Sequence, residues 1–154
     1  MTALIAVDRL TVELESDTGL VRALDQLRLT LARGETFALV GESGCGKSMT
    51  ALALMRLLPE AGSVPAGEVR LGGRDLLALP ESAMRAVRGG RIGMIFQEPS
   101  TSLNPVMTVG DQVVEAIEAH TPLRGAAARA RALEWLRRVG IPSPSAASTT
   151  TRSG

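Results

Sequence analysis

Apolar and polar residues alternate in two runs near the start of the chain. The apolar positions of these runs are Leu10, Val12 and Leu14, and then Leu27, Leu29 and Leu31. Alternation with a period of two residues predicts half-buried β-strands, because successive side chains of a strand point to opposite faces of the sheet. The residues Asp17-Thr18-Gly19 between the runs have the composition of a turn. The pattern therefore predicts an antiparallel sheet, which we expect to lie beside a parallel core.

Two later segments are apolar at nearly every position. Residues 36–40 read Thr-Phe-Ala-Leu-Val, and residues 91–96 read Arg-Ile-Gly-Met-Ile-Phe. A short continuous apolar run is typical of a buried strand, as in a parallel sheet that is covered on both faces. We therefore predict a strand in each segment. We also predict a short strand over 68–71 and a loop over 61–67, where Gly, Pro, Ser and Ala predominate.

Four further segments favour helices. They are 49–58, which Pro59 ends, 80–88, the segment that follows Thr108, and 126–139, which Gly140 ends. Thr108 can cap the third helix, and Asp111 lies near the positive end of its dipole. The buried positions predicted for the last two helices are Val109, Val113 and Ile117, and then Leu133, Leu136 and Val139.

The sequence from Gly41 to Ser48 has the pattern G-x-x-x-x-G-K-S, the phosphate-binding P-loop pattern, and lies between a predicted strand and a predicted helix. Its glycines let backbone N–H groups approach an anion closely, and the N-terminus of the helix adds a positive field. Lys47 would reach the β- and γ-phosphates of a nucleotide, and the Ser48 hydroxyl would bind Mg²⁺. The candidate nucleotide-binding residues are Gly41, Glu42, Ser43, Gly44, Cys45, Gly46, Lys47, Ser48 and Met49.

Composition strengthens this interpretation and excludes others. Lysine and arginine total 17, and Lys47 is the only lysine, so the other 16 cations are arginine. A compact ammonium is therefore present only where a P-loop needs one, and arginine does not substitute freely there. The net charge of +1 gives no electrostatic reason to expect a nucleic-acid partner. Cys45, the only cysteine, cannot form an internal disulfide and fits a reducing cytosol.

Residues 94–105 read Met-Ile-Phe-Gln-Glu-Pro-Ser-Thr-Ser-Leu-Asn-Pro. Together with the P-loop, this segment resembles the ATP-binding subunit of ABC transporters, and more narrowly the dipeptide/oligopeptide importer branch. The resemblance extends over roughly residues 3–145. It implies an α/β fold, in which an incomplete P-loop NTPase core carries an antiparallel β subdomain and part of a helical subdomain.

The resemblance also implies site residues, cofactors and partners. Gln97 would be the Q-loop glutamine, which meets Mg²⁺ and the attacking water, so Ser48 and Gln97 are the candidate metal ligands and ATP with Mg²⁺ the expected cofactors. The region after Gln97 would contact membrane-spanning permease subunits, and a second ATP-binding subunit would complete a dimer. The expected location is the cytoplasmic face of the plasma membrane. His120 is expected to be a surface residue and Trp135 a packing residue.

The chain departs from the family pattern after about residue 142. The signature motif, the Walker B strand with its acidic residues and the switch histidine do not occur, so we expect the chain to be inactive alone as an ATPase. There is also no clear aromatic residue near Val21 to stack on adenine. We expect residues 1–142 to form the N-terminal part of the ATP-binding domain and 143–154 a disordered tail. A frameshift before Ser148 would explain that tail.

Three functions follow as hypotheses. The first is the ATP-binding subunit, present as a fragment, of an importer for peptides or similar small solutes. The second is a non-catalytic, truncated or frameshifted remnant that binds nucleotide weakly or not at all. The third is an unrelated P-loop enzyme such as a small kinase, which the segment 97–105 and the two strands before the loop disfavour.

Overall fold

The computed structural model describes residues 3–42, 44, 46–96 and 103–141. The chain divides into two compact units, Met1–Ile92 and Gly93–Gly154. Some of the predictions concern residues outside this described part, namely Ser43, Cys45, Gln97 and the tail after Ile141. The structure does not test those predictions. Within the described part of the chain, no helix has the length and apolar character that crossing a membrane requires.

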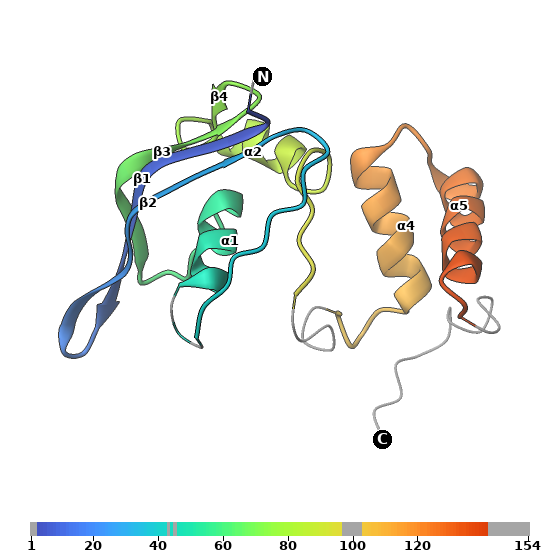
Figure 1. Cartoon of the computed structure of the whole chain (residues 1–154). Helices are drawn as coiled ribbons and strands as arrows, with labels where there is room; N and C mark the ends of the chain where they lie inside the picture. Colours follow the sequence, from blue (N-terminus) through green and yellow to red (C-terminus); the bar gives the residue numbers. More distant parts are fainter. Residues whose placement is uncertain (1–2, 43, 45, 97–102, 142–154) are drawn as a thin grey trace. The chain divides into compact units, whose positions relative to one another are not determined.

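The first unit contains an antiparallel sheet of four strands (Figure 1). Their order is β2 (Gly19–Leu31), β1 (Ile5–Ser16), β3 (Gly62–Leu71) and β4 (Arg74–Asp75). Val7 in the central strand β1 pairs with Leu29 on one side and with Val69 on the other. Both alternating runs of the sequence are therefore strands, and the predicted antiparallel pairing is confirmed.

The predicted loop over 61–67 is wrong, because β3 already begins at Gly62. Ser63 pairs with Glu13 and Ala66 with Thr11, so partners 50 and 55 residues away supply the hydrogen bonds of this segment. Its glycine, proline and serine content favours a loop locally, but long-range pairing outweighs that preference. Pro65 is tolerated because the register of β1 and β3 shifts between Thr11 and Glu13.

Two helices share a core with the sheet. These are α1 (Lys47–Met55), which lies against one face of the sheet in Figure 1, and α2 (Glu81–Val87). Ala53 of α1 and Met84 of α2 are buried in the same apolar cluster as Leu10, Val12 and Val69 of the strands. This core fixes the start of α1, and with it the end of the preceding loop, against the sheet.

Helix α1 ends at Met55, three residues before the predicted end. Arg56 has a left-handed backbone with φ of 51°, and this conformation breaks the helix. Arg88 then donates from Nε to the carbonyl oxygen of Met55 at 2.7 Å and from Nη2 to that of Arg56 at 3.1 Å. A guanidinium thus satisfies carbonyl groups that the end of a helix leaves without partners.

The two strands predicted from continuous apolar runs do not form. Residues 36–40 and 93–96 have no secondary structure, and Val40 and Ile95 are 90% and 98% exposed. A strand of a parallel sheet takes its hydrogen bonds from neighbours that are distant in sequence. Since neither segment has such a neighbour among the described residues, the apolar pattern is present without the strand.

The second unit contains the antiparallel pair α4 (Val109–His120) and α5 (Gly125–Arg138). Thr108 caps α4 as predicted, because its side chain accepts from the N–H of Asp111 at 3.1 Å. The buried contact consists of Ile117, Ala128 and Ala132. The small residues Ala128 and Ala132 of α5 let the two helices approach closely. The predicted burial of Val139 is wrong, because Val139 follows the last residue of α5 and is 73% exposed.

Candidate functional site

The candidate phosphate loop leads directly into α1. Its described residues are Gly41, Glu42, Gly44, Gly46, Lys47, Ser48 and Met49. Gly44 and Gly46 both have positive φ, at 85° and 86°. A side chain at either position would be strained in this conformation, so the shape of the loop requires glycine at Gly44 and Gly46.

Gly46 is also constrained by its neighbours. A Cβ atom on this residue would lie 2.8 Å from the carbonyl oxygen of Ala23 and 2.8 Å from Cδ2 of Leu24. Both atoms belong to β2, so the last glycine of the loop is seated directly on the sheet. This close approach fixes the start of α1 relative to β2.

Lys47 is the first residue of α1, and its ammonium turns back over the loop. Nζ donates to the carbonyl oxygen of Gly41 at 2.6 Å and to that of Glu42. Both oxygens come from the start of the loop, so the ammonium joins the start of the loop to its end. A lysine in this place can exchange carbonyl oxygens for the more strongly charged oxygens of a phosphate.

Thr50 is a contributor to the loop that the sequence analysis did not identify. Its backbone N–H and its hydroxyl both donate to the carbonyl oxygen of Gly46, at 2.8 and 2.9 Å. The side chain is buried, so this pair of bonds holds the last glycine from within the core. The available signal was a hydroxyl residue four positions after Gly46, the spacing at which a helical side chain reaches a preceding carbonyl.

The first turn of α1 offers N–H groups that can bind an anion. In any α-helix the N–H groups of the first turn have no acceptor within the helix, and they carry the positive end of its dipole. Here that turn includes Ser48 and Met49, and the Ser48 side chain is exposed. An exposed hydroxyl beside first-turn N–H groups can bind a cation that accompanies a bound anion.

Only the end of the segment after Gln97 lies in the described part of the chain. Gln112 of α4 holds the backbone of Asn104 by two hydrogen bonds. The Asn104 backbone N–H donates to Gln112 Oε1 at 2.9 Å, and Gln112 Nε2 donates to the backbone carbonyl oxygen of Asn104 at 3.0 Å. The Asn104 side chain in turn accepts from the N–H of Val106 at 3.1 Å. The Gln112 contact to the segment was not predicted, although both residues belong to the resemblance.

Charge pairing beneath α1 has a structural role. Arg88 donates to Glu81 at 2.6 Å, and this hydrogen bond is the main reason that the pKa of the Glu81 carboxyl lies below its ordinary value. The same guanidinium holds the end of α1, as described above. Glu81 therefore fixes the residue that terminates the helix of the site.

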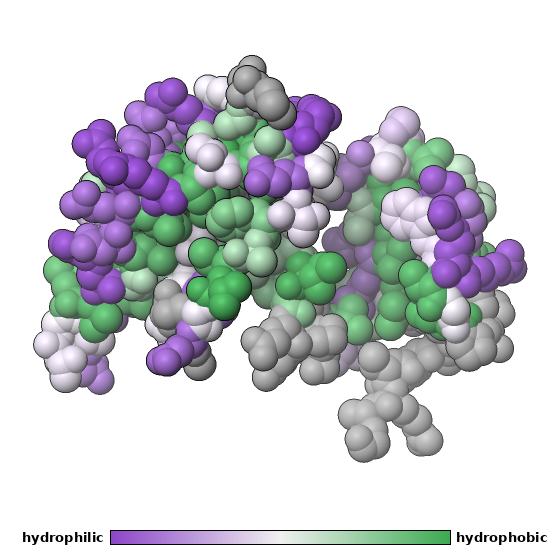
Figure 2. Space-filling model, viewed as in Figure 1, coloured by the Kyte–Doolittle hydropathy of each residue, from purple (hydrophilic) through white to green (hydrophobic). Residues whose placement is uncertain are grey.

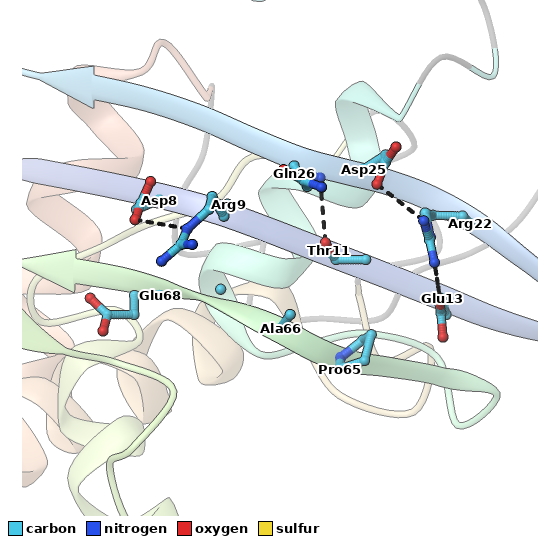
Figure 3. Close-up of a pocket in the computed structure, with 11 residues that line it drawn as sticks. Asp8, Arg9, Thr11, Glu13, Arg22, Asp25, Gln26, Pro65, Ala66 and Glu68 are labelled. Carbon is cyan, nitrogen blue, oxygen red and sulfur yellow. Dashed lines mark hydrogen bonds and ion pairs between the residues drawn. The ribbon is translucent and has the colours of Figure 1, made fainter.

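A cavity of about 610 Å³ lies over β1, β2 and β3 (Figure 3). Its charged side chains pair with one another: Arg22 with Glu13 at 3.0 Å and with Asp25 at 3.3 Å, and Arg9 with Asp8 at 3.4 Å. Among the residues that the structure describes, no group of three or more His, Cys, Asp or Glu could hold a metal ion. This cavity therefore has no pattern of phosphate or metal binding.

The other two residues singled out from the sequence are surface residues. His120 ends α4 and is exposed, as expected. Trp135 is 42% exposed on α5, with the Arg131 guanidinium 5.4 Å from its ring centre, so its packing is a cation–π contact at the surface and not a core contact.

Comparison with known proteins identifies relatives of the whole chain. The family model described as "ABC transporter" matches residues 24–153. A putative peptide import ATP-binding protein of Brucella abortus is 48% identical over 139 residues, which are 90% of this chain and 42% of that protein. The oligopeptide transport ATP-binding protein OppD of Bacillus subtilis is 46% identical over 145 residues, which are 94% of this chain and 40% of the relative. The chain thus spans about two fifths of the length of these relatives.

Solved structures support the same fold. A dimeric structure of a post-hydrolysis state of the ATP-binding cassette MJ0796, bound to ADP and Pi, matches with a TM-score of 0.80 at 23% identity. The match covers 95% of this chain and 61% of that one. The predicted fold class, an incomplete α/β P-loop core with an antiparallel β subdomain and helices, is confirmed by this likeness.

Proposed function

This chain belongs to the ABC transporter family, and we propose that it is the ATP-binding part of an importer for peptides or similar small solutes. The observation that carries the proposal is the geometry of the loop. Lys47 is the first residue of α1, and its ammonium reaches back across the loop to Gly41. The residue before it, Gly46, has no room for a side chain. Relatives named as ATP-binding proteins of peptide import and of oligopeptide transport support the substrate class.

In the proposed complex the phosphates of ATP lie over residues 41–49. The glycine-rich backbone and the first turn of α1 donate N–H groups to the phosphate oxygens, and Lys47 exchanges Gly41 and Glu42 for the β- and γ-phosphates. We propose that Ser43 and Cys45 also contribute to this cradle.

Magnesium is the cation that the donor set fits. Mg²⁺ prefers oxygen ligands, keeps several waters, and is usually held by one or two protein groups together with phosphate oxygens. The exposed hydroxyl of Ser48 is such a group, and Gln97 is proposed as the second. The ion would neutralise charge on the phosphates, while Ser48 orients it beside the loop.

We propose two protein partners. A second ATP-binding subunit is proposed because the structural neighbour is described as dimeric. Permease subunits are proposed to bind the region after Gln97, where Gln112 anchors Asn104 to α4. Such an assembly would place the chain at the inner face of the plasma membrane.

A remnant that binds nucleotide weakly or not at all is the second candidate. The observation that favours it is the segment 36–40, which directly precedes the loop and forms no strand. A loop anchored at one end only, by Gly46 on β2, loses part of its preorganisation and therefore part of its affinity.

Titration with Mg-ATP separates these candidates. Wild-type chain, Lys47→Ala and the control Arg138→Ala, which removes an exposed cation on α5, are titrated by calorimetry. Lys47→Ala removes charge-assisted hydrogen bonds to phosphate, each worth roughly 1.5–3 kcal/mol, so affinity should fall about 10- to 100-fold. Equal binding by wild type and Lys47→Ala would refute the assignment of the loop, and absence of binding by all three proteins would favour the remnant.

A further inference from the structure

Positive charge is concentrated on one helix of the second unit, α5. Four of its residues are arginine and one is glutamate, so the helix carries a net charge of +3; the arginines are Arg129, Arg131, Arg137 and Arg138. The whole chain has a net charge of only +1, so the remainder of the sequence carries −2. Figure 2 shows hydrophilic side chains over much of α5. This helix is therefore a cationic surface on a chain that is otherwise slightly acidic.

Two of these arginines are paired and two are not. Arg129 and Arg131 each lie against a carboxylate, at 3.0 and 2.7 Å. Arg137 and Arg138 are exposed and form no ion pair with any residue in the part of the chain that the structure describes. Their position in the last turn is favourable for the helix dipole. It leaves the five N–H donors of each guanidinium available to an external anion.

Two exposed apolar side chains lie beside these cations. Trp135 is 42% exposed and Val139 is 73% exposed. The N–H of Val139 donates to the carbonyl oxygen of Trp135 at 3.1 Å, so the two residues keep the helical spacing of four and lie on one side of α5. The Arg131 guanidinium lies 5.4 Å from the centre of the Trp135 ring. The dipole explains arginines at this end of the helix, but it does not explain apolar side chains left in water there.

We propose that this end of α5 binds the anionic phospholipids of a membrane surface. We call the contact the α5 patch, and it consists of Arg131, Trp135, Arg137, Arg138 and Val139. The unpaired guanidinium groups would contact lipid phosphates, which suit their planar fork of donors. Trp135 would enter the headgroup layer, because an indole has an apolar body and a polar N–H and favours the membrane–water interface. The buried side of α5 stays packed against α4, so the helix lies on the surface and does not insert.

The size of the α5 patch favours a lipid surface over a soluble protein. From Arg131 to Val139 the helix rises only about 12 Å. A contact of this length falls short of the roughly 1,200–2,000 Å² that a stable protein–protein interface buries. A bilayer requires no complementary shape, and each arginine near an anionic surface strengthens binding about fivefold. Cations around one aromatic side chain therefore match a membrane surface better than a protein partner.

The test uses the complete chain and lipid vesicles, without nucleotide or permease, so its result is independent of the proposed function. Trp135 is the only tryptophan and there is no tyrosine, so the emission of the indole reports on the α5 patch alone. With vesicles of equimolar phosphatidylcholine and phosphatidylglycerol, the emission should shift to shorter wavelength and be quenched by brominated lipid. Vesicles of phosphatidylcholine, and inorganic phosphate at the same phosphate concentration, should leave the emission unchanged.

Paired variants identify the charges that matter. Changing both Arg137→Gln and Arg138→Gln should weaken flotation with the anionic vesicles about 25-fold, because each loss costs about fivefold. The control, Arg74→Gln with Arg91→Gln, removes two exposed arginines from the first unit and should float like wild type. The change in net charge is the same in both proteins. Circular dichroism should show unchanged helix content, because every substituted side chain is exposed.

A third variant tests the aromatic side chain. Trp135→Ala should float several-fold less than wild type with the anionic vesicles, because it removes the side chain that enters the headgroup layer.

Three results would overturn the proposal. The first is equal flotation with neutral and anionic vesicles, and the second is an equal loss in the two arginine pairs. The third is flotation with no change in Trp135 emission, which would place the contact elsewhere on the chain. Binding to soluble polyglutamate through Arg137 and Arg138, without binding to anionic vesicles, would also overturn it and assign the α5 patch to an acidic protein.

Discussion

At the scale of single residues, the most constrained position outside the loop is Gly67 in β3. Its φ is 107°, and a Cβ atom would lie 2.5 Å from the carbonyl oxygen of Arg9 and 2.5 Å from Cα of Leu10. Arg9 itself has a φ of 48°, and the pairing of β1 with β3 shifts register between Asp8 and Thr11. Gly67 therefore accommodates the bulge of the central strand.

Gly67→Ala should lower the free energy of unfolding by about 2–6 kcal/mol, because backbone strain and overpacking each contribute roughly 1–3 kcal/mol. Urea denaturation followed by circular dichroism measures this change. Gly73→Ala is the matched control, since Gly73 also has a positive φ, of 84°, but nothing lies within 4 Å of its Cβ position. Equal losses in the two variants would show that the contact with β1 is not the cause.

Glu81 provides a prediction about pH at the same scale. Its pKa lies below the ordinary value of 4.5 because Arg88 donates a hydrogen bond to the charged form. A lowered pKa in the folded state stabilises the fold above pH 4.5, and the stabilisation is lost as the pH falls through the folded-state pKa. Glu81→Gln should therefore be less stable than wild type at pH 7, and the two proteins should converge once the pH is below the folded-state pKa of Glu81. A difference that persists unchanged in acid would exclude the ion pair as its source.

At the scale of elements, strands were predictable where their partners are close in sequence. β1 and β2 are joined by a short turn, so their alternation and their pairing belong to one local pattern. β3 was predicted only over 68–71, because the partner that makes a strand of 62–67 is β1, which lies 48 to 55 residues earlier. Residues 36–40 show the converse, a strand pattern for which no described neighbour exists.

The same distinction applies to the candidate site. The motif identified the glycines, Lys47 and Ser48, because a P-loop is specified by consecutive residues. Thr50 was missed because its role depends on its burial next to Gly46. The close approach of Gly46 to Ala23 was also missed, because it depends on the packing of α1 against β2. Such properties arise from tertiary structure and leave little trace in a local pattern.

Helix α4 gives a prediction at this scale. Thr108→Ala removes the side chain that accepts from the Asp111 N–H, so the α4–α5 pair should lose about 1 kcal/mol of stability. Amide exchange of residues 109–112 should accelerate about fivefold, which native-state hydrogen exchange measures. Glu115→Ala, an exposed change in the middle of α4, should have little effect. A similar acceleration in both variants would argue against capping.

At the scale of the whole molecule, binding and turnover of ATP should be separable. We expect the purified 154-residue chain not to hydrolyse ATP above background. By the family resemblance, the acidic residues that hold Mg²⁺ and activate water belong to motifs absent from this sequence, and phosphoryl transfer depends on placing these groups together. A phosphate-release assay with Lys47→Ala as the blank measures this. Steady turnover that disappears in the variant would show that the chain contains its own catalytic groups.

The placement of the only lysine at the start of α1 has a consequence for chemistry beyond nucleotides. A lysine-specific endoprotease has a single cleavage site in the whole chain, the peptide bond after Lys47. Amine-reactive labels likewise find one side chain, whose ammonium is already engaged by Gly41 and Glu42. The chain thus carries an intrinsic footprinting probe: the rate at which this one bond is cut should fall when a nucleotide occupies the loop.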